Sequence, residues 1–141
     1  MVETTANPLA YYAHPGVMTA PGEHAALLQG LPDTIPALCE IVQHNLLHIF
    51  WADRYGSPLS PERRAEVNIR RASTMLGRIA ARDNRLLTIP RPVDKRLVGN
   101  CRHFAVMLCT LLRHQGVPAR ARCGFGTYFT PGQFEDHWAC E

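Results

Sequence analysis

The chain has 141 residues, of which 46% are hydrophobic and 19% are charged, a composition typical of one globular domain with a single core. The formal net charge of +3 is too small to indicate a nucleic-acid partner, and the longest apolar runs fall far short of the ~20 residues that cross a membrane. Five cysteines without Cys-x-x-Cys spacing, and no secretory signal near the start, predict reduced thiols and a cytoplasmic location instead of a disulfide framework.

Residues 1–35 contain repeated turn signals of proline and glycine, such as His14-Pro15-Gly16. They predict an N-terminal arm, and residues 36–141 are expected to form the body of the domain. Some apolar side chains favour an arm that packs on this body and covers its core: Tyr11, Tyr12, Leu27 and Leu28.

Two long helices are predicted next, at residues 36–50 and 60–82, because apolar residues recur at helical spacing and each segment begins beside a proline. In the first helix His44 and His48 lie one turn apart, but two histidines without a third ligand make a poor metal site. The second helix carries several arginines. We interpret their side of the helix as a solvated face, and the alternative is a nucleic-acid-binding module. The arginines are Arg63, Arg64, Arg70, Arg71, Arg78 and Arg82. Residues 87–93, which contain two prolines, predict an extended connector.

A third helix is predicted between Asn100 and Gly116, where an apolar run continues for about three turns. Asn100 is a favourable N-cap, and Gly116 tolerates the positive φ of a helix C-terminus. Cys101 then occupies the first helical position, where unpaired N–H groups and the positive end of the dipole favour a thiolate over a thiol. The sequence therefore predicts a reactive cysteine at the start of a largely buried helix.

Two antiparallel strands are predicted after this helix, at residues 119–129 and 136–141, separated by the turn signal Thr130-Pro131-Gly132-Gln133. The period of two places His137 on one face of the second strand and Cys140 on the other. Cys123 and Cys140 are expected on neighbouring strands, where they could approach each other.

Cys101 and His137 are the two residues that could act together as a nucleophile and its base. A thiol nucleophile needs an imidazole partner that meets it in space, and the oxyanion needs donors such as the backbone N–H of Cys101. From spacing alone, a buried cysteine beside an unrelated histidine remains the simpler interpretation. A zinc site built from Cys101, His103, His137 and Cys140 is a further alternative, although the spacings match no zinc pattern. His103 faces away from Cys101 by about 200° of helix rotation, which predicts a structural or exposed role.

The order of several motifs resembles a known family. The chain carries Asn100-Cys101-Arg102-His103-Phe104-Ala105 at a helix start, an LLR-x-x-G-V-P-A-R segment from Leu111 to Arg120, and then Glu135-Asp136-His137-Trp138. Over about residues 97–141 this pattern resembles the transglutaminase-like superfamily. The resemblance implies an α+β, papain-like fold, with N-terminal helices and a buried helix packed on an antiparallel sheet that is incomplete in this chain.

The resemblance also implies roles for individual residues. Cys101 matches the nucleophile and His137 the general base, and Trp51, Asn100 and Arg102 are expected at the oxyanion hole or cleft. The implied reaction is acyl transfer from the amide bond of a peptide or other substrate, ending in hydrolysis, deamidation or cross-linking, with no metal or cofactor. The alternative is a non-catalytic relative that binds proteins.

The family's third catalytic residue, an Asp or Asn on the next strand, has no match in the chain. Asp136 points to the opposite face of the strand from His137, and Glu141 lies ~13 Å further along it. A two-stranded ribbon is also marginal by itself. We therefore expect a chain truncated within its sheet, whose activity is weak or absent unless the full-length protein completes it.

Overall fold

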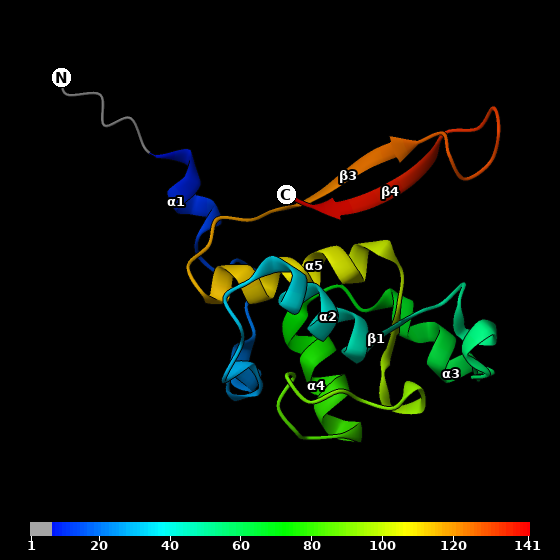
Figure 1. The fold of residues 1–141 in the computed structure, drawn as a ribbon, viewed down its shortest axis with the longest axis horizontal. Coiled ribbons are helices and arrows are strands. Elements are labelled where there is room, and N and C mark those ends of the chain that lie inside the picture. The colour runs from blue at the N-terminus through cyan, green and yellow to red at the C-terminus, as the bar shows by residue number, and fades with distance from the viewer. Residues whose placement is uncertain (1–6) are drawn as a thin grey trace.

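The computed structural model describes residues 7–141, which fold into helices and two small sheets (Figure 1). The helices are α1 (Pro8–Tyr12), α2 (Ile35–Asn45), α3 (Pro61–Arg64), α4 (Ala72–Arg82) and α5 (Cys101–His114). Short 3₁₀ segments lie between them: η1 (Gly22–Leu28), η2 (Ala52–Tyr55), η3 (Ala65–Asn68) and η4 (Val93–Lys95). The strands are β1 (Leu46–His48), β2 (Leu97–Gly99), β3 (Ala121–Gly126) and β4 (Glu135–Cys140). The fold class is α+β, as predicted.

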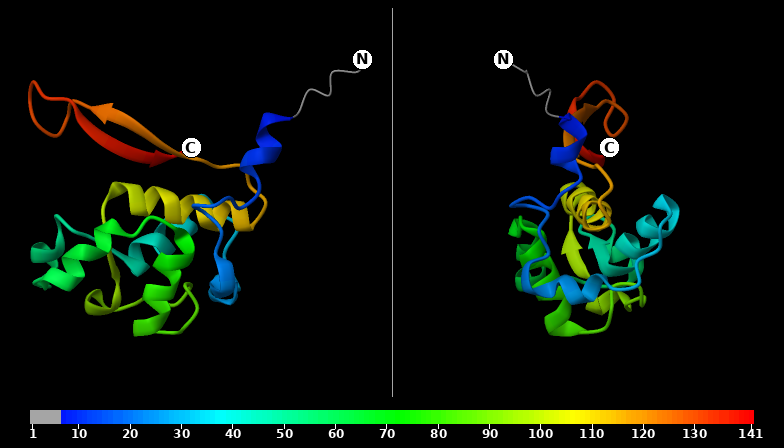
Figure 2. Two further views of the ribbon diagram at one scale, coloured as in Figure 1. Left: turned by 180° about the vertical axis from the view of Figure 1, so that it is seen from behind. Right: turned by 90° about the vertical axis from the view of Figure 1, so that its left-hand side faces the viewer.

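Helix α5 forms where the sequence predicted it. It starts after the N-cap Asn100, and Gly116 beyond its end has a φ of 75°, in the left-handed region that glycine adopts without strain. Helices α2 and α4 pack against α5 from one side, and the β3–β4 hairpin lies along its other side (Figure 2). Met107 and Leu111 are fully buried in the main core, where each contributes roughly 1.5–3 kcal/mol.

The predicted helix 36–50 is wrong beyond Asn45. Residues Leu46–His48 instead form β1, which pairs in parallel with Leu97–Gly99 of β2. The amide of Asn45 donates hydrogen bonds to Ile41 O and Leu87 O, so it ends the helix and ties it to a distant loop. The strand pairing then satisfies the backbone groups that a longer helix would have used.

The predicted helix 60–82 is also interrupted, because the chain leaves helical geometry between η3 and α4. Arg102 donates to the carbonyls of Val67, within η3, and of Ile69, in the break itself, while His103 Nε2 donates to Ile69 O. The carboxylate of Glu66, only 5% exposed, accepts the Val98 N–H at 2.8 Å. Contacts with the segment around α5 therefore replace helical hydrogen bonds in this stretch.

Strands β3 and β4 pair antiparallel as predicted, with Gly124 opposite His137 and Ala121 opposite Cys140. Cys123 and Cys140 lie on these neighbouring strands and both are free thiols. The Sγ of Cys140 lies 3.1 Å from Cys109 Sγ on α5, and this contact connects the hairpin to the helix.

The segment predicted as an arm contacts the rest of the chain at several points, although its first six residues lie outside the described range. Ala119 N–H donates to Tyr12 O, and Leu27 and Leu28 are buried in the main core. Tyr11 does not cover the core, since it is 73% exposed. Within residues 7–141, none of the helices combines the length and the apolar character needed to cross a lipid bilayer.

Candidate active site

A cleft of about 1050 Å³ opens beside the N-terminal end of α5. Cys101 and Asn100 line it from the helix start, His137 lines it from β4, and Trp51 lines it from the loop that follows β1. Cys101 is partly buried, and it lines this cleft. Four of the residues nominated from the sequence therefore lie around one cavity.

The position of Cys101 follows from local geometry. Strand β2 ends at Gly99, and Asn100 turns the chain into α5 with extended backbone angles. Cys101 is the first residue of α5, and the amides of a first helical turn have no intrahelical acceptor. A thiol at this place meets both the positive end of the helix dipole and an unpaired donor.

The position of His137 follows from how the hairpin lies on α5. Strand β4 and α5 run in the same direction (Figure 1), and the contact between Cys109 and Cys140 fixes their relative position. His137 precedes Cys140 by ~10 Å of strand, and Cys101 precedes Cys109 by ~12 Å of helix. Both residues therefore lie at about the same height along the helix axis.

The surroundings of His137 are aromatic. Its ring centroid lies 5.1 Å from that of Phe129 and 6.2 Å from that of Tyr128, both in the hairpin loop. In residues 7–141 no carboxylate and no thiol is hydrogen-bonded to His137, and Glu141 instead accepts from Arg120 and Arg122.

Trp51 and Arg102 have different surroundings. Trp51 is 44% exposed at the cleft, and the Arg54 guanidinium lies 4.3 Å from its ring centroid. Arg102 does not line the cleft as expected from the sequence. Its guanidinium is held by the carbonyls of Val67 and Ile69, so it stabilises the break before α4.

His103 is a structural residue, 1% exposed beneath the turn that carries Cys101. Its Nδ1 accepts the Asn100 N–H at 3.1 Å, and its Nε2 donates to Ile69 O at 2.8 Å. Burial lowers the pKa of His103 to about 4, with a further contribution from the charge of Arg102, so the ring is neutral. Because both nitrogens are engaged, His103 cannot join the zinc site considered above, and the described residues contain no cluster suited to a metal ion.

The low pKa of His103 predicts a pH-dependent stability. The folded protein binds fewer protons than the unfolded chain between the ordinary pKa of 6.5 and about 4. Stability is therefore fully present above pH 6.5 and is lost as pH falls through this window, by on the order of 3 kcal/mol. Urea unfolding measured across this range checks it against His103→Gln, whose curve should be flatter. Parallel curves for the two proteins would contradict the assignment.

His48 lines the cleft, which the sequence did not indicate. The sequence pattern paired it with His44 on one helix face, but the end of α2 at Asn45 places the two histidines in different elements. Burial lowers the pKa of His48, and the nearby charge of His137 lowers it further. Leu46 and Leu47 are both buried and His48 is partly buried, so no alternating pattern in the sequence marks this strand.

Two further cysteines, Cys109 and Cys123, have opposite surroundings, one buried and one exposed. Contact with Cys140, together with burial, raises the pKa of the Cys109 thiol, so Cys109 stays protonated. Cys123 is exposed on β3, where it pairs with Trp138, and it does not line the cleft. It is therefore an ordinary surface thiol against which Cys101 can be compared.

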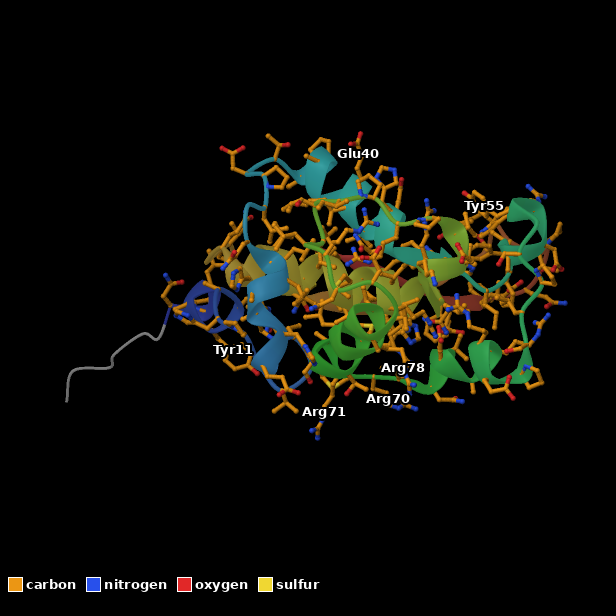
Figure 3. The ribbon with its side chains drawn as sticks, turned by 90° about the horizontal axis from the view of Figure 1, so that it is seen from below. Tyr11, Glu40, Tyr55, Arg70, Arg71 and Arg78 are labelled. Atoms are coloured by element: carbon orange, nitrogen blue, oxygen red, sulfur yellow. The ribbon has the colours of Figure 1, made fainter. Side chains whose placement is uncertain are left out.

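The basic residues of segment 60–82 divide into two groups. Arg63 and Arg82 form ion pairs with the buried Glu66. Arg64, Arg70, Arg71 and Arg78 are exposed, and the last three point outward on one side of the molecule (Figure 3). The predicted solvated face therefore contains fewer arginines than the sequence suggested, because Arg63 and Arg82 pair with a buried carboxylate instead.

Comparison with known proteins adds one finding. A family model described as the transglutaminase-like superfamily matches residues 63–140, which is more than half of the chain and includes both Cys101 and His137. No curated protein and no solved structure matches the chain.

Proposed function

Because this chain belongs to the transglutaminase-like superfamily, we propose that its cleft carries out thiol-dependent acyl transfer from amide bonds, with Cys101 as nucleophile and His137 as general base. The observation that supports this most is the shared cleft, in which a half-buried thiol at a helix start and an imidazole from β4 lie at the same height along α5. The packing of that helix against a strand hairpin is also what a papain-like arrangement requires.

The proposed reaction proceeds in two steps. His137 takes the thiol proton, the Cys101 sulfur bonds to the amide carbonyl carbon, and the C–N bond breaks as His137 returns the proton to the leaving amine or ammonia. Water activated by His137 then attacks the thioester, which gives hydrolysis or deamidation, and an amine in its place gives cross-linking. The substrate we propose is a peptide or another amide-bearing molecule.

Turnover by this chain is expected to be slow. In the described residues no carboxylate orients the His137 ring, and loss of the orienting Asp from a serine triad costs about 10⁴ in rate. The reactivity of the Cys101 thiol is therefore a more direct test than product formation.

The test compares two thiols within one sample. Near pH 6, where an ordinary thiol is almost entirely protonated, limited iodoacetamide is added and each cysteine peptide is quantified by mass spectrometry. We expect Cys101 to be alkylated at least about tenfold faster than the exposed Cys123, and His137→Ala to slow Cys101 alone. Cys101→Ser identifies the Cys101 peptide. Equal rates at the two cysteines would favour a non-catalytic binding domain.

A further inference from the structure

His48 occupies a place beside the turn that carries Cys101. In the parallel pairing of β1 with β2, His48 is in register with Gly99, and the next amide, Ile49 N–H, donates to Gly99 O at 2.8 Å. Cys101 lies two residues after Gly99 in the chain. His48 therefore lies on β1, and β1 is hydrogen-bonded to β2, the strand that leads into α5.

The ring of His48 is held by aromatic neighbours. Its centroid lies 5.9 Å from that of Phe104, one turn after Cys101 on α5, and 5.4 Å from that of Phe50. Its Nδ1 accepts the Phe50 N–H at 3.3 Å. An imidazole whose Nδ1 accepts a hydrogen bond while neutral carries its proton on Nε2. Within residues 7–141 no acceptor is hydrogen-bonded to this Nε2, which leaves its proton for a molecule in the cleft.

The neutral form of His48 is favoured by its environment. Burial is the main cause of its lowered pKa, and the charge of His137 on the facing strand acts in the same direction. A neutral imidazole donates a hydrogen bond to a developing oxyanion without having to lose its own proton, a role that histidine fills in other enzymes.

Acyl transfer needs more than one donor at the carbonyl oxygen. The Cys101 N–H supplies one, and a second must come from another element that lines the cleft. We propose that His48 is this second donor: its Nε2–H binds the carbonyl oxygen of the acyl group that Cys101 attacks. This inference rests on the proposed function, since it assigns a residue to the same reaction.

The step balances without any further reactant. The Cys101 thiolate forms a bond to the carbonyl carbon, and the carbonyl π electrons move to the oxygen, which accepts hydrogen bonds from Cys101 N–H and His48 Nε2–H. The oxyanion then collapses, the bond to the leaving group breaks, and a thioester remains. His48 keeps its proton throughout.

Two substitutions at His48 test its two nitrogens separately, the acceptor Nδ1 and the proposed donor Nε2–H. In His48→Asn the side-chain amide reaches about as far as Nδ1, so it can accept the Phe50 N–H but cannot reach the oxyanion. In His48→Gln the amide reaches about as far as Nε2 and retains a donor there. With p-nitrophenyl acetate as the probe, acetylation of Cys101 should fall about 10²-fold in His48→Asn, as when other enzymes lose an oxyanion donor, and fall much less in His48→Gln.

Alkylation by iodoacetamide is the matched measurement, because displacement of iodide develops no oxyanion at a carbonyl. Its rate at Cys101 should be the same in the wild type and both variants, which shows that the fold and the thiol are intact. Unchanged acetylation in His48→Asn overturns the assignment of His48, while fast alkylation of Cys101 still supports the proposed function. If alkylation itself shows no activated Cys101, the proposed function fails.

Trp51 provides the competing assignment, since it also lines the cleft and its indole carries an N–H donor. Trp51→Phe removes this donor and keeps an aromatic ring. We expect acetylation to fall clearly less in Trp51→Phe than in His48→Asn. A loss of about 10²-fold in Trp51→Phe, with none in His48→Asn, would assign the donor to Trp51 and overturn the proposal for His48.

Discussion

Replacing Glu66 by alanine is expected to destabilise the folded protein by about 3–5 kcal/mol, the usual cost of removing one member of a buried ion pair. One carboxylate oxygen of Glu66 contacts the guanidinium groups of Arg82 and Arg63, and the other accepts the Val98 N–H at 2.8 Å. The substitution removes the ion-pair partner of Arg82 and one of the negative charges near Arg63, and it leaves the buried Val98 N–H without an acceptor. Urea unfolding followed by circular dichroism measures the loss.

The control for this prediction is Glu62→Ala. Glu62 is exposed in the first turn of α3, on the same segment, and its replacement should leave the unfolding midpoint nearly unchanged. Glu66→Gln keeps an acceptor for Val98 but removes the charge, so it should fall between alanine and the wild type. A shift for Glu66→Ala no larger than that for Glu62→Ala would show that the buried carboxylate does not stabilise the fold.

Replacing Arg91 by methionine is expected to cost about 3 kcal/mol or more. Arg91 is 1% exposed, and its guanidinium donates to Asn45 Oδ1, Asp83 O and Arg85 O. Methionine fills a similar volume but donates no hydrogen bond, so several buried acceptors lose their partner at about 1–3 kcal/mol each. Because Asn45 also ends α2, the loss should reach the core that α2 forms with α5.

Arg85→Met makes the same chemical change at the surface. Arg85 is exposed and pairs with Asp83, and surface ion pairs contribute little to stability. Its unfolding midpoint should stay near that of the wild type, while that of Arg91→Met falls clearly. If the two variants unfold at the same urea concentration, the buried guanidinium is not a stabilising link between α2 and the loop after α4.

Elements that are determined by residues close to them in the sequence could be predicted. Helix α5 begins and ends where Asn100 and Gly116 indicate, because capping acts within one turn of the chain. The antiparallel pairing of β3 and β4 followed from a turn signal between two strand-like segments. These features need no knowledge of distant contacts.

Elements that depend on distant residues were mispredicted. The segment after Asn45 has helical periodicity, yet it pairs with β2, about 50 residues further on. The segment 60–82 is interrupted because side chains of α5 satisfy carbonyls at Val67 and Ile69. Periodicity within a window cannot detect partners that lie outside it.

The sequence alone determined the family and the two candidate reactive residues, Cys101 and His137, because the order of their motifs is carried by the chain itself. Only the tertiary structure decided which side chains share the cleft with them: it places His48 there and turns Arg102 away. The physical reason is that a cleft is assembled from separate segments. The role of each polar side chain depends on which of its hydrogen-bonding groups the fold leaves unpaired.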